Sequence, residues 1–433
     1  MAANPTRHLR PARWSAAASH REGGASRSAV GFGVIPLEEA RAYILDVCPP
    51  LPSRSLPLLE AAGCVLAEDV VADEDVPPFA NTAMDGYALR AADTADPPVR
   101  LRVVGTLAAG AAPTAEVRPG QAVRIMTGAP IPPGADAVVM VEQTQSENRG
   151  ATVTIEVEAA PGQHVREAGE DLRAGDAVFA SGTVLSPGHV GVLASVGREA
   201  VQVVPRARVG VLSTGDELVA GGRPLRPGQI RDSNRPTLLA LVAAAGCEAV
   251  DLGLVGDDEE ALVAAVEGGA AACDALVTSG GVSVGDFDYV KAVLDRLGEM
   301  NWWQVAIRPA KPLAFGMIGS TPVFGLPGNP VSSMVSFELF ARPALRQMMG
   351  HAVLDRPRVA AVADEGLGRR PDGKLHLVRV IATTGEDGRW HVRSSGGQAS
   401  HLLHAMARAN ALALVPDGDG VDAGEQVEVM LLH

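Results

Sequence analysis

The chain has 433 residues, of which 47% are hydrophobic and 20% are charged, and its formal net charge is −14. This length is enough for two to four domains with substantial cores. The negative charge argues against nonspecific binding to nucleic acid or to acidic membranes, but it is compatible with a local basic pocket for a small anion.

Cysteine usage and hydropathy narrow the class of protein further. The four cysteines form no CxxC pair, and the ten histidines show no metal-ligand spacing. Reduced thiols packed in a core, as in a cytoplasmic protein, are the simplest interpretation. No apolar run approaches 18 residues, so we expect no membrane span.

Residues 1–33 differ in composition from the rest of the chain. They are rich in Arg, Ala, Ser and Gly and contain no strong apolar stretch, which does not fit a secretory signal. We predict a disordered tail, while the Arg-rich and acid-poor composition also resembles an organelle transit peptide.

The next segments alternate between helical and strand patterns. Residues 37–47 read as a helix, and we assign residues 34–77 and 162–205 to one discontinuous linker subdomain. Between them, residues 78–161 contain short Val, Ile and Thr runs that Gly or Pro bounds, which predicts a β-rich lobe.

The pattern changes again after residue 206. In residues 206–350, apolar strands alternate with helices of 10–15 residues, which predicts a parallel sheet with helices on both faces. Residues 351–433 contain short strands separated by Gly and Asp turns, which predicts a small β-barrel. The predicted fold class is therefore multidomain α/β: a central parallel-sheet subdomain, a β-rich lobe and a C-terminal barrel.

Acidic side chains follow three of the predicted parallel strands. Glu217, Asp257 and Asp288 each come after a strand end, where the loops of a parallel sheet converge. Carboxylates there suit a hard cation such as Mg²⁺, which commonly bridges phosphate oxygens. Acids at helix starts are also ordinary caps, so this alternative stays open for each of them.

Two further stretches suit an anionic ligand. Glycine in the segment after residue 278 lets backbone N–H groups approach an anion, which makes this turn a binding candidate: Ser279, Gly280, Gly281 and Ser283. Arg308 and Lys311 lie on a proline-stiffened segment, although they also fit a solvated surface pair.

Several motifs together resemble one family. The motifs are NTAMDGYAL, RIMTGAPIPPGADAVVMVEQ, LSTGDEL, TSGGVSVGDFDYVK and FGLPGNPVSS, which occur in this order. They resemble the molybdopterin molybdenumtransferases, the MoeA and gephyrin E-domain family, over residues 35–433.

The resemblance implies an activity and a site. It implies insertion of molybdenum from molybdate into adenylylated molybdopterin, with Mg²⁺ and release of AMP, by a homodimer whose cleft is shared between protomers. It implies that Glu217, Asp257 and Asp288 act in the cleft and hold the metal. The facing lobe of the second protomer would supply Asp85, Thr127 and Asp171.

The same resemblance extends to the ligand contacts. It implies that Arg308 and Lys311 lie near substrate phosphates and the oxyanion, that Arg379 and Ser400 help to hold molybdate, and that Pro327 and Pro330 shape a structural turn. Relatives often have Lys at the positions of Gln304 and Arg308, so one cationic contact is missing here and another has a different geometry.

Two other functions remain compatible with these residues. One is a noncatalytic pterin-binding scaffold, because a fold does not fix an activity. The other is a nucleotide or pterin hydrolase of the CinA type that shares the α/β subdomain alone. The retained acids argue against the first, and the β-rich lobe and barrel argue against the second.

Overall fold

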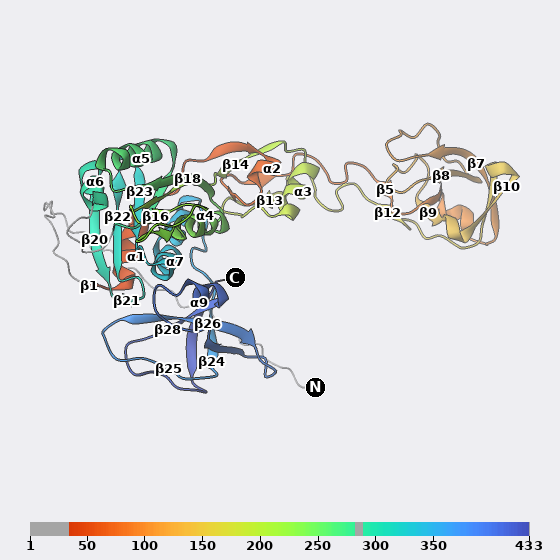
Figure 1. Ribbon diagram of the computed structural model, residues 1–433. Helices are drawn as coiled ribbons and strands as arrows, with labels where there is room; N and C mark the ends of the chain where they lie inside the picture. The colour runs from red at the N-terminus through yellow and green to blue at the C-terminus, as the bar shows by residue number, and fades with distance from the viewer. Residues whose placement is uncertain (1–33, 282–288, 433) are drawn as a thin grey trace, which may run out of the picture.

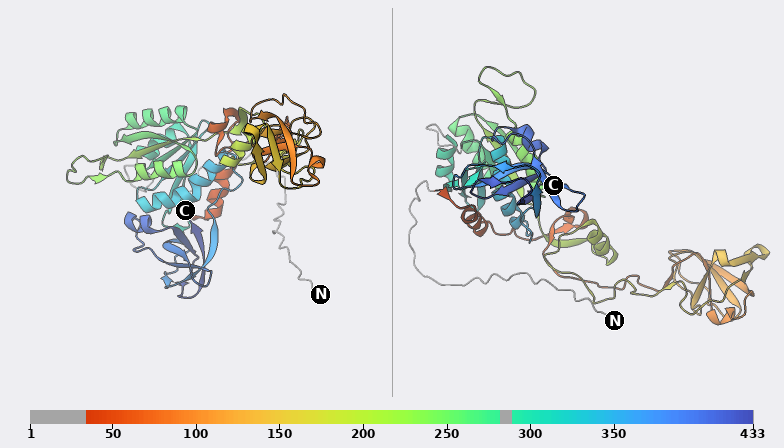
Figure 2. Two further views of the ribbon diagram at one scale, coloured as in Figure 1. Left: turned by 90° about the vertical axis from the view of Figure 1, so that its right-hand side faces the viewer. Right: turned by 90° about the horizontal axis from the view of Figure 1, so that it is seen from below.

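The computed structural model describes residues 34–281 and 289–432. The predicted tail, residues 1–33, therefore lies outside the described residues. Figure 1 shows an elongated molecule with the α/β subdomain at one end, a barrel beside it, and a β-rich lobe at the opposite end of a narrow connection. The view from below in Figure 2 shows the same separation of the lobe.

A seven-stranded mixed sheet forms the centre of the α/β subdomain, in the order β1-β20-β22-β23-β19-β15-β18. Its strands are β1 (Val34–Ile35), β15 (Arg208–Thr214), β18 (Glu248–Val255), β19 (Ala275–Ser279), β20 (Glu299–Val305), β22 (Pro312–Ile318) and β23 (Thr321–Leu326). β18, β15, β19 and β23 pair in parallel, which confirms the predicted parallel sheet. β22 runs antiparallel to both of its neighbours.

Helices cover both faces of this sheet, because its strands carry apolar side chains on both faces. Val209 and Val211 of β15 point into one core and Leu212 points into the other, because successive side chains of a strand face opposite sides. The helices are α1 (Leu37–Asp46), α4 (Asn234–Ala244), α5 (Glu259–Ala272), α6 (Tyr289–Leu297), α7 (Pro330–Ser336) and α8 (Arg342–Met348). The first core takes α1, α4, α7 and α8, and the second takes α5 and α6. α1 and β1, which the sequence analysis groups with the linker, thus pack on the α/β layer.

The linker and the lobe are built from β-structure. The linker elements are β2 (Arg54–Pro57), α2 (Leu58–Ala61), β3 (Val65–Leu66), β4 (Val70–Val71), β13 (Ala177–Phe179), α3 (Pro187–Ser195) and β14 (Ala200–Val204). The stem that leads to the lobe contains one short pair, β5 (Asn81–Thr82) with β12 (Val165–Arg166). The lobe sheet contains β6 (Gly86–Leu89), β7 (Val99–Leu107), β8 (Gln121–Ile125), β9 (Ala137–Met140), β10 (Thr144–Glu147) and β11 (Thr152–Ile155).

The C-terminal strands close into a five-stranded barrel, which confirms that prediction. The ring runs through β26 (Leu375–Thr384), β27 (Trp390–Ser394), β24 (Arg358–Ala363), β30 (Gln426–Leu431) and β28 (Ala411–Val415), and it closes because β28 also pairs with β26. A short strand from the α/β subdomain, β21 (Ile307–Arg308), adds to the barrel beside β26. The barrel also carries α9 (Leu403–Arg408) and the pair β25 (Leu367–Gly368) and β29 (Gly420–Val421).

Across the described ranges, every helix is too short or too polar to traverse a bilayer. Cys48, Cys64, Cys247 and Cys273 are all free and buried. Burial raises the pKa of the Cys48 and Cys247 thiols to about 12, so both stay protonated and unreactive at neutral pH.

Candidate active site

Loops that follow the parallel strands meet at one edge of the central sheet. The Asp216 carboxylate, after β15, accepts a hydrogen bond of 2.9 Å from the backbone N–H of Asp257, after β18. Glycine at 256 allows this approach, because a Cβ there would lie 2.7 Å from the same Asp216 oxygen. The loops that carry Glu217 and Asp257 are therefore in direct contact at one edge of the sheet, as the sequence predicts.

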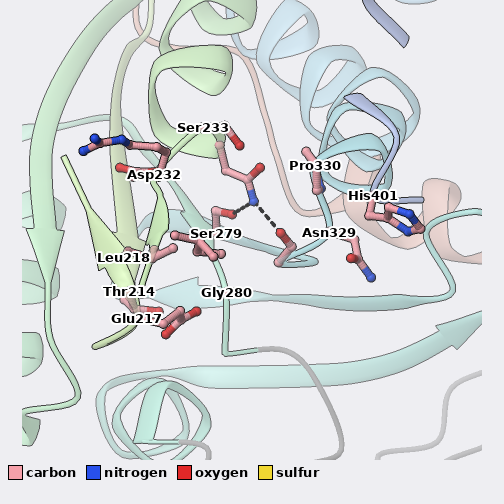
Figure 3. Close-up of a pocket in the computed structure, with 14 residues that line it drawn as sticks. Thr214, Glu217, Leu218, Asp232, Ser233, Ser279, Gly280, Asn329, Pro330 and His401 are labelled. Carbon is pink, nitrogen blue, oxygen red and sulfur yellow. Dashed lines mark hydrogen bonds between the residues drawn. The ribbon is translucent and has the colours of Figure 1, made fainter. Parts of the chain in front are cut away.

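A cavity of about 300 Å³ opens at this edge. Figure 3 shows Glu217 on one side of it and Pro330 with His401 on the other. The walls come from the loops after β15, β19 and β23, from the start of α4 and from the barrel: Thr214, Glu217, Leu218, Ile230, Arg231, Asp232, Ser233, Asn234, Ser279, Gly280, Gly328, Asn329, Pro330 and His401.

Two predicted acids, Glu217 and Asp257, have exposed carboxylates at this edge. Neither carboxylate has a hydrogen bond or ion pair to any residue that the structure describes. Gly215, at φ +142°, makes room for Glu217, because a Cβ there would lie 2.5 Å from a Glu217 carboxylate oxygen. The third predicted acid, Asp288, and the nearby Ser283 lie outside the described residues.

The donor set fits a hard divalent cation. Mg²⁺ in proteins is commonly held by one or two carboxylates together with substrate phosphates, rather than by a complete protein cage. Within residues 34–281 and 289–432, no cluster of three or more Asp, Glu, His or Cys side chains could hold a metal alone. Glu217 and Asp257 thus offer free oxygen ligands of the right kind, and a ligand would have to supply others.

The glycine turn after β19 adopts a conformation that other residues rarely reach. Gly280 has φ +99° and Gly281 has φ +68°. A Cβ on Gly280 would lie 2.9 Å from the Thr214 carbonyl oxygen, and one on Gly281 would lie 2.2 Å from the Val290 Cβ. The two glycines therefore allow the end of β19 to pack tightly against β15 and α6 beside the cavity.

Asn234, the first residue of α4, ties two of these loops together. Its side-chain nitrogen donates to the Ser279 hydroxyl at 2.8 Å and to the Gly328 carbonyl at 2.7 Å. The adjacent Asp232 is buried and accepts from the Ser213 hydroxyl at 3.1 Å and from the Arg235 Nε at 2.9 Å. Sequence reasoning missed Asn234 and Asp232, because polar residues before a helix read as an ordinary start of the helix.

Arg379 lies on β26 and is fully buried. Its Nη2 donates to the carbonyls of Gly397 at 2.8 Å and Ala399 at 3.3 Å, while Nε and Nη1 have no partner in the described part of the chain. Burial lowers the pKa of this guanidinium, but not enough to deprotonate an arginine at neutral pH. No carboxylate offsets its charge within the described residues.

The turn that holds Arg379 also contacts the cavity wall. The Ser400 carbonyl accepts from the Val331 N–H at 3.1 Å, directly after Pro330, and His401 lines the cavity. Pro330 begins α7 at a position where proline fits, and Pro327 is buried just before the turn. The structure therefore brings Arg379, Ser400 and Pro330 to the same edge as Glu217.

Arg308 and Lys311 follow β20, whose direction matches that of β15, β18, β19 and β23. Both side chains are exposed at the same edge of the sheet. Arg308 forms a long ion pair with Asp372 at 3.8 Å, and Lys311 has no charged partner among the described residues.

Asp85 and Thr127 lie together, but far from this edge within one chain. Thr127 donates to the same Asp85 oxygen from its backbone N–H at 2.6 Å and from its hydroxyl at 2.7 Å. The bond from the Thr127 backbone, followed by that from its hydroxyl, lowers the pKa of Asp85. Asp171 lies on the stem, where its N–H donates to the Val76 carbonyl at 2.9 Å. Figure 1 shows that the lobe stands at the opposite end of the molecule from the α/β edge.

Comparison with known proteins places these features in a family. Three family models match in order: "MoeA N-terminal region (domain I and II)" at residues 35–197, "Probable molybdopterin binding domain" at 210–347, and "MoeA C-terminal region (domain IV)" at 369–432. A molybdopterin molybdenumtransferase of Haemophilus influenzae is 40% identical over 399 residues, which cover 92% of this chain and 98% of the relative. The chain belongs to the MoeA family.

Further members of the MoeA family match over the same length. Molybdopterin molybdenumtransferase 2 of Mycobacterium tuberculosis is 42% identical over 90% of this chain and 96% of its own. The crystal structure of a molybdopterin biosynthesis MoeA protein from Pyrococcus horikoshii covers 93% of this chain and 100% of its own, at 32% identity and a TM-score of 0.74. The match extends over the lobe and the barrel. It therefore argues against a hydrolase of the CinA type, which would share the α/β subdomain alone.

Proposed function

We propose that this chain is a molybdopterin molybdenumtransferase, which inserts molybdenum from molybdate into adenylylated molybdopterin and releases AMP. The observation that carries the proposal is the buried Arg379 guanidinium, whose Nε and Nη1 have no partner among the described residues, near the same sheet edge as the free carboxylates of Glu217 and Asp257. The names of the relatives at 40% and 42% identity support the same activity.

Arg379 has the properties of an oxyanion site. A buried guanidinium is costly when its N–H groups lack acceptors, so its retention calls for a ligand that supplies them. Its planar fork matches the oxygens of a tetrahedral oxyanion such as molybdate. Ser400, on the adjoining turn, would add a hydroxyl to this site.

Glu217 and Asp257 are proposed to hold Mg²⁺, and Asp288 is the further ligand that the sequence predicts. The metal would supply positive charge to the pyrophosphate oxygens of the substrate. Glu217 would keep its carboxylate available because Gly215 leaves it room, and Asp257 would be positioned through the bond from its N–H to Asp216.

The cavity wall is proposed to orient the substrate. Ser279 and Gly280 line the cavity, with Gly281 next in the same turn, and Asn234 fixes the Ser279 hydroxyl by a hydrogen bond of 2.8 Å. Arg308 and Lys311 would bind substrate anions at the same edge. Gln304 is neutral and would contribute no charge there.

A homodimer is proposed because the site is divided within one chain. Asp85, Thr127 and Asp171 lie on the lobe and stem, which a single chain holds far from Glu217 (Figure 1). In a two-fold dimer, the lobe of one protomer could complete the cleft of the other. The buried free thiols support location in a reducing compartment, and we propose the cytoplasm.

Release of AMP from adenylylated molybdopterin on addition of molybdate tests the activity. A noncatalytic scaffold would bind this substrate and release none. The shared cleft is tested by mixing two inactive variants, Asp85→Asn and Glu217→Gln, under conditions that exchange subunits. Mixed dimers would contain one intact cleft, so roughly a quarter of the wild-type activity should return. If the mixture stays inactive although subunits exchange, Asp85 of one protomer and Glu217 of the other do not form one cleft.

A further inference from the structure

A positively charged loop leaves the sheet edge beside the cavity. It consists of residues 218–231, which we call the arginine arm. Its base is a short parallel pair, β16 (Leu218–Val219) with β17 (Ile230–Arg231), and residues 220–229 join these two strands. Figure 2 shows the arm as a green loop that extends beyond the α/β subdomain in both views. A Cβ on Gly228 would meet nothing within 4 Å, so this part of the arm faces open space.

The charge of the arginine arm is opposite to that of the whole chain. The arm contains Arg223, Arg226 and Arg231 and no acidic residue, whereas the chain has a net charge of −14. Arg223 and Arg226 are exposed, and their guanidinium groups have no hydrogen bond or ion pair to any described residue. Arg231 donates to the Gly221 carbonyl at 2.8 Å and so braces the arm. Two cations close together in the chain are therefore free to bind a ligand.

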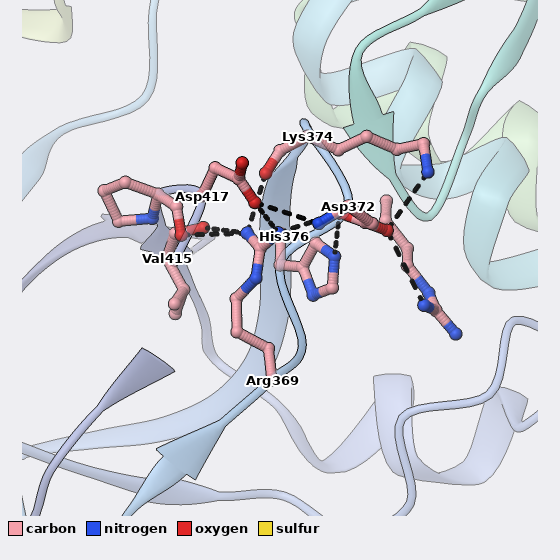
Figure 4. A network of polar contacts seen from close by, with 8 residues as sticks. Arg369, Asp372, Lys374, His376, Val415 and Asp417 are labelled. Atoms are coloured by element: carbon pink, nitrogen blue, oxygen red, sulfur yellow. Dashed lines mark hydrogen bonds and ion pairs between the residues drawn. The ribbon is translucent and has the colours of Figure 1, made fainter. Parts of the chain in front are cut away.

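An arginine of the barrel shows the opposite situation. Arg369 donates to Asp372 at 2.7 Å and to Asp417 at 2.6 Å, and its side chain is only 3% exposed (Figure 4). A guanidinium that two carboxylates already hold offers little to another anion. Arg223 and Arg226 keep all of their N–H donors available, because no carboxylate of the described chain binds them.

The backbone of the arginine arm is held in a defined shape. Residues 223–227 read RPLRP, so a proline with a fixed φ follows each of the two free arginines. The Arg226 N–H donates to the Gln229 side-chain oxygen at 3.1 Å, and the Gln229 N–H donates to the Arg226 carbonyl at 3.1 Å. At the base, the Ile230 N–H donates to the Glu217 carbonyl at 2.8 Å. A segment that is already ordered loses less entropy when it binds a partner.

An apolar side chain lies between the two free arginines in the chain. Leu225 is 45% exposed and belongs to none of the hydrophobic clusters of the described residues. Nucleic acid is a poor ligand for such a loop, because the arm has no aromatic side chain for base stacking and the acidic chain repels phosphates. An acidic protein segment fits better, since arginine pairs with carboxylates through two parallel hydrogen bonds and Leu225 offers an apolar contact.

We infer that the arginine arm is a docking site for an acidic segment of a partner protein. Arg223 and Arg226 bind carboxylates of the segment, and Leu225 packs against one of its apolar side chains. Ile230 and Arg231, at the base of the arm, line the cavity, so the docked partner lies beside the cavity. Docking of this kind goes beyond the proposed reaction and does not depend on it.

Fluorescence anisotropy measures this docking on the full-length chain, with a fluorescein-labelled peptide of Asp and Glu residues around one central Leu as the probe. The double variant Arg223→Gln/Arg226→Gln should bind the peptide at least about tenfold more weakly, because both carboxylate contacts lose their charge. Arg223→Lys/Arg226→Lys should bind with intermediate affinity, since it keeps the charge and lacks the planar fork. Leu225→Ala should weaken binding by about threefold, as for partial loss of one apolar contact.

Arg149→Gln/Arg393→Gln is the matched control, because these two arginines are exposed on the lobe and the barrel and their guanidinium groups have no bond to any described residue. It should bind the peptide with wild-type affinity. Docking at the arm is refuted if the wild type binds no peptide, if the arm variant binds it as the wild type does, or if the control loses as much affinity.

Two comparisons test where the peptide binds and what kind of partner it represents. If Arg308→Gln weakens peptide binding as much as the arm variant does, the peptide binds at the cations beside the cavity and the assignment to the arm is wrong. A single-stranded oligonucleotide of equal charge should bind more weakly than the peptide. If it binds as tightly and responds to the same arm variant, the arm binds nucleic acid and the proposed protein partner is wrong.

Discussion

The side-chain amide of Asn234 donates a hydrogen bond of 2.8 Å to the Ser279 hydroxyl, across 45 positions of sequence. The same nitrogen reaches the Gly328 carbonyl at 2.7 Å. One residue at the start of α4 thus fixes the neighbouring loops after β19 and β23, which both line the cavity.

Replacing Asn234 by Asp should weaken both the fold and the site. An ionised Asp cannot donate, and it would face the Gly328 carbonyl, so we expect a loss of about 1–3 kcal/mol in the free energy of unfolding. The KM for adenylylated molybdopterin should rise. Urea unfolding and steady-state kinetics measure the two effects. Thr237→Ala serves as the control, since Thr237 lies on the same helix, does not line the cavity and makes no side-chain hydrogen bond to a described residue; equal effects of the two changes would contradict the role of Asn234.

Gly281→Ala should be strongly destabilising. The added Cβ would lie 2.2 Å from the Val290 Cβ, and φ is +68°, so both packing and backbone oppose the change. Overpacking and the left-handed conformation together predict a loss of about 2–4 kcal/mol, measured by urea unfolding. Gly222→Ala, where a Cβ would meet nothing within 4 Å, should be nearly neutral. A neutral Gly281→Ala would mean that the turn after β19 is packed differently.

The buried Arg379 and the partly buried Arg356 should respond oppositely to replacement by Met. Arg379 has no carboxylate partner in the described part of the chain, so Arg379→Met should leave thermal stability unchanged or raise it while molybdate binding is lost. Arg356 donates to both oxygens of the buried Glu338, at 2.9 and 3.0 Å. Arg356→Met should therefore cost about 3–5 kcal/mol, because it removes the bidentate partner of a buried carboxylate. Thermal melting of both variants compares them, and a large destabilisation by Arg379→Met would show that Arg379 is structural.

Asp372 should make stability depend on pH in the acid range. Burial favours its protonated form, but hydrogen bonds from Lys374 and His376 outweigh this and lower its pKa from 3.8 to about 2. Because the folded pKa lies below the unfolded one, ionised Asp372 stabilises the fold above pH 3.8, and this contribution disappears as the pH falls to about 2. Urea unfolding at pH 6, 4 and 3 should show a steeper loss in the wild type than in Asp372→Asn. Parallel curves would contradict the lowered pKa.

Local sequence patterns predict much of this edge of the sheet. Apolar runs that end in polar or glycine-rich turns identify β15, β18 and β19, and the parallel arrangement then places Glu217, Asp257 and Gly280 at one edge. This inference needs no knowledge of distant contacts, because the direction of each strand fixes where its following loop lies.

Other features depend on contacts that the patterns do not reveal. The reversal of β22 is encoded in Gly319 and Ser320, two turn residues between apolar runs, which is a hairpin pattern that the helix-and-strand alternation hides. Asn234 reads as part of a helix start, and its role appears once Ser279 and Gly328 are placed beside it. Arg379 is buried because the barrel packs on the α/β layer, and local sequence patterns do not reveal this packing. In the sequence, only the family resemblance identifies Arg379 as a candidate ligand contact.

The most direct test of the account is AMP release in a single turnover, from adenylylated molybdopterin with Mg²⁺ and molybdate, by the wild type, Glu217→Gln and Glu267→Gln. Glu267 is an exposed acid on α5 and is the charge-matched control. We predict rapid molybdate-dependent release by the wild type and by Glu267→Gln, and release at least about a hundredfold slower by Glu217→Gln, as for the loss of one group that stabilises transition-state charge. Wild-type release by Glu217→Gln would contradict the assignment of the reaction to this edge of the sheet.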